Sequence, residues 1–538
     1  MVRSPSSDIE IPDLSVHEYL FGHFDESRLD HPALIDGTSG AVTTYRRLLA
    51  QVDGFAGALA ARDVGVGDVV AVLCPNVPAF ATVFHGILRA GATATTVNSL
   101  YTPDEIASQL DDAGARWLVT VGALLPGAIA AAERHGIPAE QVVVLDGAPG
   151  HPSLADLLGE GRTAPEVEFD PATHVAVLPY SSGTTGRPKG VMLTHRNLVA
   201  NVAQCRAAIG LEHSDRVLAV LPFFHIYGMT VLLNFALSRR ASLVTMPRFD
   251  LAEFLRVVSE HRATWVFIAP PIAVALAKHP MVDEFDLSSV KVVFSGAAPL
   301  DGALAELVAA RLGCTVCQGY GMTETSPVTH VIPVDRDELD RSSIGVLLPN
   351  TEARVVDSDS GSGAGADVDV PDDGTASSPG ELLIRGPQVM TGYLGRPDAT
   401  ADMLDEDGWL HTGDVATVTA DGVFRIVDRL KELIKYKGYQ VAPAVLEAVL
   451  LEHPAIADAA VIGTLDEDGQ EVPKAFVVVQ AGQTLDEQAV MAFIAERVAP
   501  HEKVRAVEFI DRVPKSASGK ILRKDLRARE AEARGSGR

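Results

Sequence analysis

In the first 430 residues, hydrophobic positions form short runs rich in β-branched residues, separated by longer stretches with helical periodicity. The runs predict buried strands and the stretches predict amphipathic helices. We expect strands at 69–73, 117–120, 142–145, 265–268 and 290–294, and helices at 78–90, 195–209, 250–262 and 300–312. Thr194 suits the N-cap of the second of these helices. This alternation favours an α/β fold in which helices cover mostly parallel sheets.

The pattern changes after about residue 430. We expect a helix at 443–451, strands near 458–463 and 474–480, a helix at 487–498, a strand at 505–510 and then a polar terminal helix. The sequence therefore predicts a large N-terminal domain over 1–430 and a small α+β domain over 431–538. Residues 358–379 are polar and rich in glycine, which predicts a flexible surface loop between strands.

Composition narrows the classes of function. A chain of 538 residues is too long for one core, and its formal charge of −26 argues against nucleic acid or an anionic membrane as a partner. Cys314 and Cys317 have redox or zinc spacing, but they lie in a short apolar run that predicts a buried strand. The chain shows no N-terminal signal and no apolar run long enough to span a membrane, so we expect a cytoplasmic protein.

One segment has the composition of a phosphate-binding loop: Tyr180-Ser-Ser-Gly-Thr-Thr-Gly-Arg-Pro-Lys-Gly190. Glycines let backbone N–H groups approach an anion, hydroxyls add donors, and the lysine adds a positive charge. The order of residues is not that of a Walker loop, which needs Gly-Lys-Ser/Thr in succession. Strand-like runs at 175–178 and 191–193 flank the segment, which places it between two strands.

Five more segments carry side chains that are suited to chemistry. They are Leu221-Pro-Phe-Phe-His-Ile-Tyr-Gly228, Gln318-Gly-Tyr-Gly-Met-Thr-Glu324, Gly408-Trp-Leu-His-Thr-Gly-Asp414, the cationic run 428–438, and Pro514-Lys-Ser-Ala-Ser-Gly-Lys520. Each segment by itself also has a purely structural interpretation. Their order across more than three hundred residues makes coincidence a poor explanation.

This ordered set resembles the adenylate-forming superfamily of acyl-CoA synthetases, luciferases and peptide-synthetase adenylation domains, over residues 30–527. The segments 225–227, 318–324 and 431–443 are most similar to 4-coumarate–CoA ligases and their bacterial cinnamate–CoA relatives. The resemblance implies a small mobile C-terminal domain with its hinge at Lys431. It also implies that the protein uses ATP, Mg²⁺ and coenzyme A to activate a small carboxylic acid. The acid first becomes an acyl-AMP, and coenzyme A then displaces AMP.

The resemblance further implies a role for individual residues. Lys520, His225 and Lys435 are the expected catalytic residues, and Glu324 is the expected Mg²⁺ ligand. Binding of ATP and AMP is expected from Ser181, Ser182, Gly183, Thr184, Thr185, Lys189, Gln318, Gly319, Tyr320, Thr323, Asp414, Arg429, Lys431, Lys435, Gln440 and Lys520. Coenzyme A is expected at Arg248, Lys437 and Gly438. The acyl pocket is expected from His225, Ile226, Tyr227, Val231, Gly296, Ala297, Gly319, Gly321, Met322, Pro327, Val328 and Val331.

Several points stay open at this stage. The expected acyl pocket is apolar and contains no acid, which suits an aryl acrylate such as cinnamate or 4-coumarate but also a medium-chain fatty acid. Valine at 231 favours plain cinnamate over a hydroxylated ring. The turn Pro500-His-Glu-Lys503 departs from the family pattern, which puts its contacts with coenzyme A in doubt. A luciferase-like oxygenase and a non-catalytic nucleotide-binding protein are the alternatives from other classes.

Overall fold

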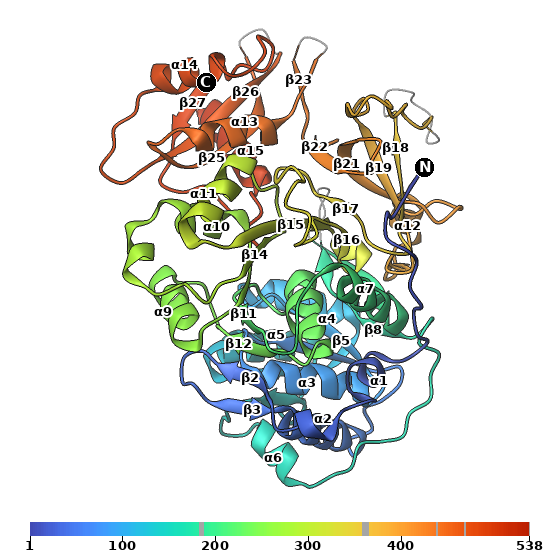
Figure 1. Cartoon of the computed structure of the whole chain (residues 1–538). Helices are drawn as coiled ribbons and strands as arrows, with labels where there is room; N and C mark the ends of the chain where they lie inside the picture. The colour runs from blue at the N-terminus through green and yellow to red at the C-terminus, as the bar shows by residue number, and fades with distance from the viewer. Residues whose placement is uncertain (182–187, 358–364, 437–438, 467–469, 537–538) are drawn as a thin grey trace.

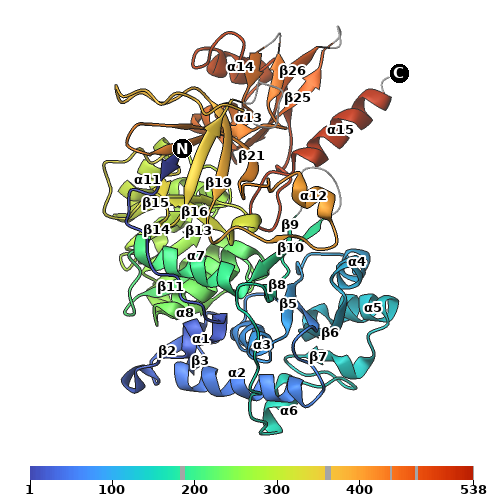
Figure 2. The same cartoon turned by 90° about the vertical axis from the view of Figure 1, so that its right-hand side faces the viewer.

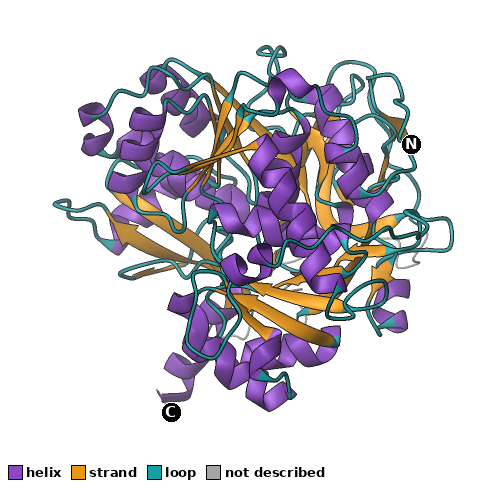
Figure 3. Cartoon of the chain, turned by 90° about the horizontal axis from the view of Figure 1, so that it is seen from below, coloured by secondary structure: helices purple, strands orange, loops and turns teal. Residues whose placement is uncertain are grey.

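The computed structural model describes residues 1–181, 188–357, 365–436, 439–466 and 470–536. A large N-terminal domain carries a small C-terminal domain at one end (Figure 1). Helices lie against the strands throughout the large domain (Figure 3). The α/β architecture predicted from the sequence is confirmed, with one sheet that differs from the prediction.

The largest sheet has nine strands and contains the strands predicted at 265–268 and 290–294. Its order is β17-β16-β15-β14-β13-β11-β12-β2-β3, and the run from β15 to β2 is parallel. The strands are β2 (Pro32–Asp36), β3 (Val42–Thr44), β11 (Arg216–Ala219), β12 (Ser242–Thr245), β13 (Trp265–Ile268), β14 (Val292–Ser295), β15 (Thr315–Gly321), β16 (Val328–Val331) and β17 (Val346–Leu347). Most strand positions are buried, because helices cover this sheet on its faces.

A second sheet of eight strands holds the two strands that flank the phosphate-loop segment. Its order is β20-β10-β8-β5-β4-β6-β7, with β9 paired to β10. The strands are β4 (Val69–Leu73), β5 (Thr93–Thr96), β6 (Ala115–Thr120), β7 (Val142–Val144), β8 (Val175–Val177), β9 (Tyr180–Ser181), β10 (Lys189–Thr194) and β20 (Gly392–Tyr393). The pairs among β4, β5, β6, β7 and β8 are parallel, as predicted.

The third sheet of the large domain is antiparallel throughout, which differs from the mostly parallel arrangement predicted for this part of the chain. Its five strands are β1 (Val2–Arg3), β18 (Glu352–Val356), β19 (Gly380–Arg385), β21 (Leu410–Val418) and β22 (Phe424–Arg429). A parallel pair needs a long crossover, usually a helix, whereas a short turn can join an antiparallel pair. Residues 419–423 join β21 to β22 in this short way.

The helices of the large domain begin and end close to the predicted positions, and Thr194 caps α7 as predicted. They are α1 (Val16–Phe21), α2 (Tyr45–Ala60), α3 (Pro78–Arg89), α4 (Pro103–Ala113), α5 (Leu125–His135), α6 (Leu154–Gly159), α7 (His195–Ala208), α8 (Phe235–Ser238), α9 (Leu251–His261), α10 (Pro270–Lys278), α11 (Gly302–Leu312) and α12 (Pro397–Ala401). A π-helix, η4 (Tyr227–Asn234), runs directly into α8. The short 3₁₀ segments are η1 (Glu26–Arg28), η2 (Gly122–Leu124), η3 (Ala139–Gln141), η5 (Pro280–Glu284) and η6 (Thr323–Thr325).

Helix α7 is buried between the two large sheets, where it contacts β8 and β10 on one side and β16 on the other. Its buried amide side chains bond to backbone carbonyls of β16 and of the segment 387–389. Asn197 Nδ2 donates to Pro387 O and Val389 O at 2.8 and 2.9 Å, and Asn201 Nδ2 donates to Val328 O at 2.7 Å. These bonds satisfy buried carbonyl groups, so α7 fixes the segments around it.

The small domain has the predicted order of elements. It contains the hairpin β23 (Ile434–Tyr436) and β24 (Tyr439–Val441), the sheet β25 (Ile456–Leu465), β26 (Glu471–Val479) and β27 (Ala506–Phe509), and the helices α13 (Pro443–Glu452), α14 (Glu487–Ala495) and α15 (Arg523–Ser536). Helix α15 extends away from the body of the molecule (Figure 2). The domain has its own apolar core, which includes Leu446, Ile456, Val477 and Ile494.

Two remaining sequence predictions concern the cysteines and a membrane span. Cys317 is buried in β15 as predicted, while Cys314 lies just before that strand and is half-buried. Both thiols are free, and no cluster of possible metal ligands occurs in the described residues.

The loop between β18 and β19 falls partly outside the described residues, at 358–364. None of the described helices is long and apolar enough to cross a membrane.

A buried ion-pair network sits where the two domains join. Arg523, at the start of α15, pairs with Glu432 and with Glu447 of α13, the latter at 2.7 Å. The three side chains are only 10–13 % exposed. Asp428 Oδ2, at the end of β22, accepts a hydrogen bond from Ala444 N at 2.8 Å. The network therefore sets the position of α13 and α15 relative to the last strand of the large domain.

We predict that Arg523→Met lowers the free energy of unfolding of the small domain by about 3 kcal/mol, because it leaves Glu432 and Glu447 buried without a cation. Urea denaturation followed by amide hydrogen exchange in β25 and β26 measures this. Arg527→Met is the matched control, since Arg527 lies on the same helix and is exposed. Equal effects of the two substitutions would contradict the prediction.

Candidate active site

The parallel strands of the nine-stranded sheet deliver the predicted site residues to one edge. Because β11, β13, β14 and β15 run in the same direction, the segments that follow them leave the sheet at the same end. His225 follows β11, Gly296 follows β14, and Gly319 and Tyr320 end β15. Ligands of open α/β sheets bind at the carboxyl ends of the strands. The topology therefore gathers segments that lie far apart in the sequence.

The phosphate-loop segment meets Glu324 at this edge. Glu324 is 5 % exposed, and its Oε1 accepts hydrogen bonds from Ser181 Oγ at 3.0 Å and from the Tyr393 hydroxyl at 2.8 Å. The Lys189 ammonium lies 4.3 Å from the centre of the Tyr393 ring. Ser182, Gly183, Thr184 and Thr185 lie outside the described residues. Both described ends of the loop thus converge on one buried carboxylate.

A second buried carboxylate, Asp414 of β21, lies beside the end of β15. It is 4 % exposed, and its Oδ2 accepts a hydrogen bond from the Tyr320 hydroxyl at 2.5 Å. Its Oδ1 lies 3.1 Å from Arg429 Nε on the neighbouring strand β22. The negative charge of Asp414 raises the pKa of Arg429, which therefore stays cationic in this half-buried position. The register of β21 and β22 places the two residues directly opposite each other.

Lys520 reaches the same site from the small domain. Burial and, to a smaller extent, the charge of Arg429 lower the pKa of its amine to about 8, while Asp414 and Glu324 act in the opposite direction. The preceding residue, Gly519, has a φ of +86° and approaches the start of α10 closely. A Cβ there would lie 2.9 Å from Ala269 Cβ, so only glycine fits this approach. The loop therefore holds Lys520 against the large domain.

His225 shares the electrostatic field of Lys520. Burial lowers the pKa of His225 to about 3, and the nearby charge of Lys520 contributes to the shift. Nδ1 of the ring accepts a hydrogen bond from the Tyr227 N–H at 3.3 Å. The imidazole is therefore neutral at physiological pH, and its proton lies on Nε2.

The residues predicted to form the acyl pocket come from three segments that pack together. Tyr227 of η4 lies against Gly296, where a Cβ would be 2.8 Å from the tyrosine ring. Gly319 and Gly321 of β15 pair with Val331 and Val328 of β16, which brings both strands into the set. The whole set is buried or half-buried: His225, Ile226, Tyr227, Val231, Gly296, Ala297, Gly319, Gly321, Met322, Pro327, Val328 and Val331.

Other predicted residues are not at this site in the structure. Lys435 and Gln440 lie exposed on the β23–β24 hairpin, and the backbone N–H of Lys435 donates to Glu471 of the small domain at 2.9 Å. Lys431 and Arg248 are also exposed, Arg248 in the segment between β12 and α9. Lys437 and Gly438 lie outside the described residues. One face of the small domain, the one that carries Lys520, is thus turned toward the site.

Two further predicted residues, Gln318 and Thr323, lie in β15 and just after it. The Gln318 side chain is 2 % exposed, and its amide bonds to backbone groups of Leu300 and Arg341. It therefore holds two loops in place. Thr323 is half-buried at the start of η6, directly before Glu324.

Sequence reasoning missed Tyr393 and the amides of α7. Tyr393 lies almost seventy residues after Glu324, on a two-residue strand that pairs with β10. Asn201 holds Val328 through two bonds, one given by its Nδ2 and one accepted by its Oδ1. The only signal in the sequence was the run of polar residues on an otherwise apolar helix, which predicts buried hydrogen bonds without naming their partners.

Glu324 fits a divalent cation that is shared with phosphate groups. Its Oε1 takes two hydroxyl donors, while no hydrogen bond reaches Oε2 within the described ranges. Mg²⁺ prefers oxygen ligands and is usually bound by one or two carboxylates together with substrate phosphates and water. One buried carboxylate next to the segment predicted to bind phosphate is consistent with that pattern.

Comparison with known proteins supports this arrangement along nearly the whole chain. Residues 21–394 match the model of the AMP-binding enzyme family, and residues 445–520 match that of the AMP-binding enzyme C-terminal domain. The chain is 42 % identical to 4-coumarate–CoA ligase 5 of Oryza sativa subsp. japonica, with 98 % of this chain and 97 % of the relative covered. It is 41 % identical to the 4-coumarate–CoA ligase of Pinus taeda, with 99 % and 98 % covered.

Solved structures show the same fold. The crystal structure of an anthranilate CoA ligase in complex with anthranoyl-AMP matches with a TM-score of 0.87 and 26 % identity, covering 97 % of this chain and 98 % of the other. ATP-bound MatB from Rhodopseudomonas palustris matches with a TM-score of 0.84 and 29 % identity, covering 96 % and 99 %. The fold and the gathered cations and carboxylates define an adenylate-forming ligase.

The chain belongs to the AMP-binding enzyme family. It is an AMP-forming acid–thiol ligase of the 4-coumarate–CoA ligase-like kind, which acts on a carboxylic acid with ATP and coenzyme A. The family and the class of reaction predicted from the sequence are therefore confirmed.

We predict that formation of acyl-AMP falls as the pH rises above about 8, because Lys520 then loses its charge. Below that pH the ammonium is present, so kcat/KM for pyrophosphate exchange stays level from neutrality and then drops roughly tenfold per pH unit. Lys520→Arg keeps a cation at all these pH values and is expected to remove the break. A level wild-type profile up to pH ~10 would contradict the prediction.

Proposed function

We propose that the acid is a 4-coumarate- or cinnamate-type aryl acrylate, and that the enzyme converts it to its coenzyme A thioester in two half-reactions with ATP and Mg²⁺. The observation that carries the two half-reactions is that the buried Lys520 amine lies within electrostatic reach of Arg429, Asp414, Glu324 and His225. The names of the 42 % identical relatives support the choice of acid.

In the first half-reaction the carboxylate attacks the α-phosphorus of ATP, and pyrophosphate leaves. Two anions must meet, so the protein has to supply cations and N–H donors around them. We assign the β- and γ-phosphates to Ser181, Ser182, Gly183, Thr184, Thr185 and Lys189, the α-phosphate to Thr323, and the contact between carboxylate and α-phosphate to Lys520. The cations Lys189 and Lys520 approach from opposite domains, which supports this division.

Asp414 and Arg429 are assigned to the ribose, and Gln318, Gly319 and Tyr320 to the adenine side. Asp414 already accepts one hydroxyl, from Tyr320, which supports its role as an acceptor of sugar hydroxyls. Glu324 would hold Mg²⁺, which neutralises phosphate charge when it is bound. His225 stays neutral and orients the acyl group through its Nε2–H.

In the second half-reaction the thiol of coenzyme A replaces AMP. We propose that the small domain, 431–538, then rotates about Lys431 relative to 1–430, which withdraws Lys520 and brings Lys435, Lys437, Gly438 and Gln440 to the nucleotide. Arg248 would bind a phosphate of coenzyme A. The exposure of Lys435, Gln440 and Arg248 supports the proposal, because these side chains are free to meet a ligand after rotation.

The acyl pocket supports a planar ring. Its set carries no acidic side chain, and Gly296 lets the Tyr227 ring approach the backbone closely, because a Cβ there would lie 2.8 Å from the ring. Gly319 lets the Phe294 ring approach in the same way, since a Cβ would lie 3.0 Å from it. Surroundings of tyrosine, phenylalanine and valine suit an aromatic acid.

We predict that pyrophosphate exchange is faster with cinnamate and 4-coumarate than with hexanoate or octanoate. Gly296→Ala places a methyl group against Tyr227 and is expected to lower kcat/KM for the aryl acids roughly tenfold or more. Gly302→Ala is the matched control, because its Cβ meets nothing closer than 3.4 Å. Absence of exchange with every cinnamate would overturn the proposed acid.

A second prediction separates the half-reactions. Lys520→Ala is expected to slow acyl-AMP formation roughly 10²–10³-fold, the effect of losing one preorganised charge, while thioester formation from supplied acyl-AMP largely survives. Lys437→Ala is expected to show the opposite preference. If both variants slowed both half-reactions equally while remaining folded, the rotation of the small domain would be the wrong explanation.

A further inference from the structure

A cavity of about 520 Å³ lies at the opposite edge of the nine-stranded sheet from the active site. Its lining residues belong to segments that precede the parallel strands. Arg28 lies before β2, His213 before β11, and Arg239 and Arg240 before β12. The active site is built from segments that follow these strands. None of the lining residues of the cavity belongs to the site described above.

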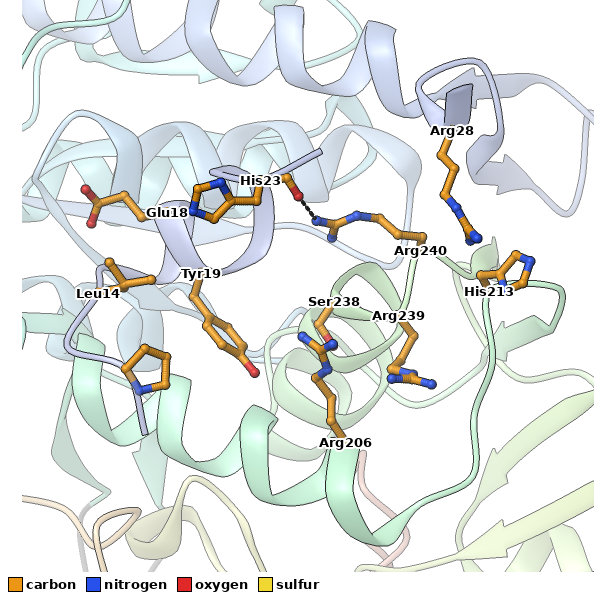
Figure 4. A pocket seen from close by; sticks show the side chains of 11 residues that line it. Leu14, Glu18, Tyr19, His23, Arg28, Arg206, His213, Ser238, Arg239 and Arg240 are labelled. Carbon is orange, nitrogen blue, oxygen red and sulfur yellow. Dashed lines mark hydrogen bonds between the residues drawn. The ribbon is translucent and has the colours of Figure 1, made fainter. Parts of the chain in front are cut away.

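The cavity concentrates positive charge in a strongly acidic protein. Arg28, Arg206, Arg239 and Arg240 line it together with a single carboxylate, Glu18, which leaves a net charge of +3 with the histidines neutral. Figure 4 shows Arg206, Arg239 and Arg240 on one side of the cavity and Glu18 at the other end. The Glu18 carboxylate is already engaged, because its Oε2 accepts a hydrogen bond from Ser15 N at 2.9 Å in the cap of α1.

The charge of these four arginines is only partly offset by nearby carboxylates, such as Asp25 beside Arg28 and Glu212 beside Arg239. None of them forms an ion pair with a carboxylate in the part of the chain that the structure describes, whereas Arg196 and Arg46 each pair with an aspartate. Burial lowers the pKa of Arg239, the charge of Arg206 lowers it further, and the exposed Glu212 only partly offsets them. The pKa of Arg240 is lowered mainly by burial, with contributions from Arg206 and Arg28.

Two of the arginines are held in place by neutral groups. Arg239 Nε donates to Leu211 O at 2.6 Å, and Arg240 donates to Leu237 O at 2.9 Å and His23 O at 3.0 Å (Figure 4). Carbonyl oxygens fix the guanidinium groups but leave their charge uncompensated. A cluster of like charges that is fixed in this way is preorganised for an anion.

The remaining wall is apolar. Pro12, Leu14 and the ring of Tyr19 line it, and the Arg206 guanidinium lies 5.9 Å from the centre of that ring. The cavity thus combines a cationic side with a flat aromatic side, within a volume that admits a small phosphorylated molecule.

We propose that this cavity is a second anion site that binds a diphosphate group, separate from the catalytic nucleotide site. Guanidinium groups bind phosphate oxygens through paired hydrogen bonds, and a diphosphate supplies enough negative charge to neutralise the cluster. The group has two possible carriers, inorganic pyrophosphate, which the adenylation reaction releases, and a nucleoside diphosphate, whose base the ring of Tyr19 would face.

Hydrogen–deuterium exchange of the full chain with inorganic pyrophosphate tests the site directly. Slower exchange is expected in segments 14–28, 206–213 and 238–240, in addition to changes at the catalytic site. Arg28→Gln and Arg206→Gln are each expected to weaken binding at these segments roughly tenfold or more, the effect of losing one charge-assisted contact. Arg47→Gln, on the exposed side of α2, is the matched control and is expected to leave binding unchanged.

A parallel experiment with ADP distinguishes the two carriers. If Tyr19→Ala weakens the binding of ADP but not that of pyrophosphate, the carrier is a nucleotide. If the variant binds both ligands as tightly as the wild type does, the carrier is the inorganic anion. The ligase activity of Arg28→Gln and Arg206→Gln is expected to stay at the wild-type level without added ligand. The proposal is overturned if millimolar pyrophosphate and ADP leave these segments unprotected, or if the arginine variants bind both as wild type does.

Discussion

Two buried carboxylates, Glu324 and Asp414, set the electrostatics on which the active site depends. Each is almost fully buried and surrounded by donors, with Ser181 and Tyr393 around Glu324 and Tyr320 and Arg429 around Asp414. Their negative charge lets cations gather before any substrate arrives. Without it, Arg429 and Lys520 would repel each other in a position where burial also lowers the pKa of the lysine, an effect that the two carboxylates oppose. The site is thus charged in advance for two anionic substrates that would otherwise repel each other.

Buried polar side chains, as well as apolar packing, hold these carboxylates in position. Helix α7 lies between the two large sheets, and its amides bond to backbone around residues 328 and 387–389. Those segments include the start of β16, which carries part of the proposed acyl pocket, and lead to Tyr393. Gln318 plays the same part within β15, where it fixes the loops at 300 and 341. Irregular segments near the site therefore owe their positions to hydrogen bonds from regular elements.

The distribution of positive charge follows the topology of the parallel sheet. In a chain of net charge −26, cations gather at both edges of the same strands. At the carboxyl edge they face buried carboxylates, whereas at the amino edge Arg239 and Arg240 bond to backbone carbonyls and Arg206 faces an aromatic ring. At the junction of the domains, Arg523 is matched by Glu432 and Glu447. Cations that have a carboxylate partner within the protein stabilise the fold, whereas cations without such a partner are available to a ligand.

Local patterns in the sequence determined the strands at 69–73 and 265–268, the cap at Thr194, the small domain and the motifs of the family. These features depend on hydrophobic periodicity, capping residues and loop composition, which act over a few neighbouring positions. Only the tertiary structure decided which of the two lysine-bearing faces is turned to the site, with Lys520 inside and Lys435 outside, since the contact of Gly519 with α10 joins parts of the chain that lie far apart in the sequence. The partners of Asn201 and Tyr393, the antiparallel third sheet and the arginine cavity were likewise beyond the sequence. Each joins residues that lie far apart in the chain, and no short-range pattern encodes such a pairing.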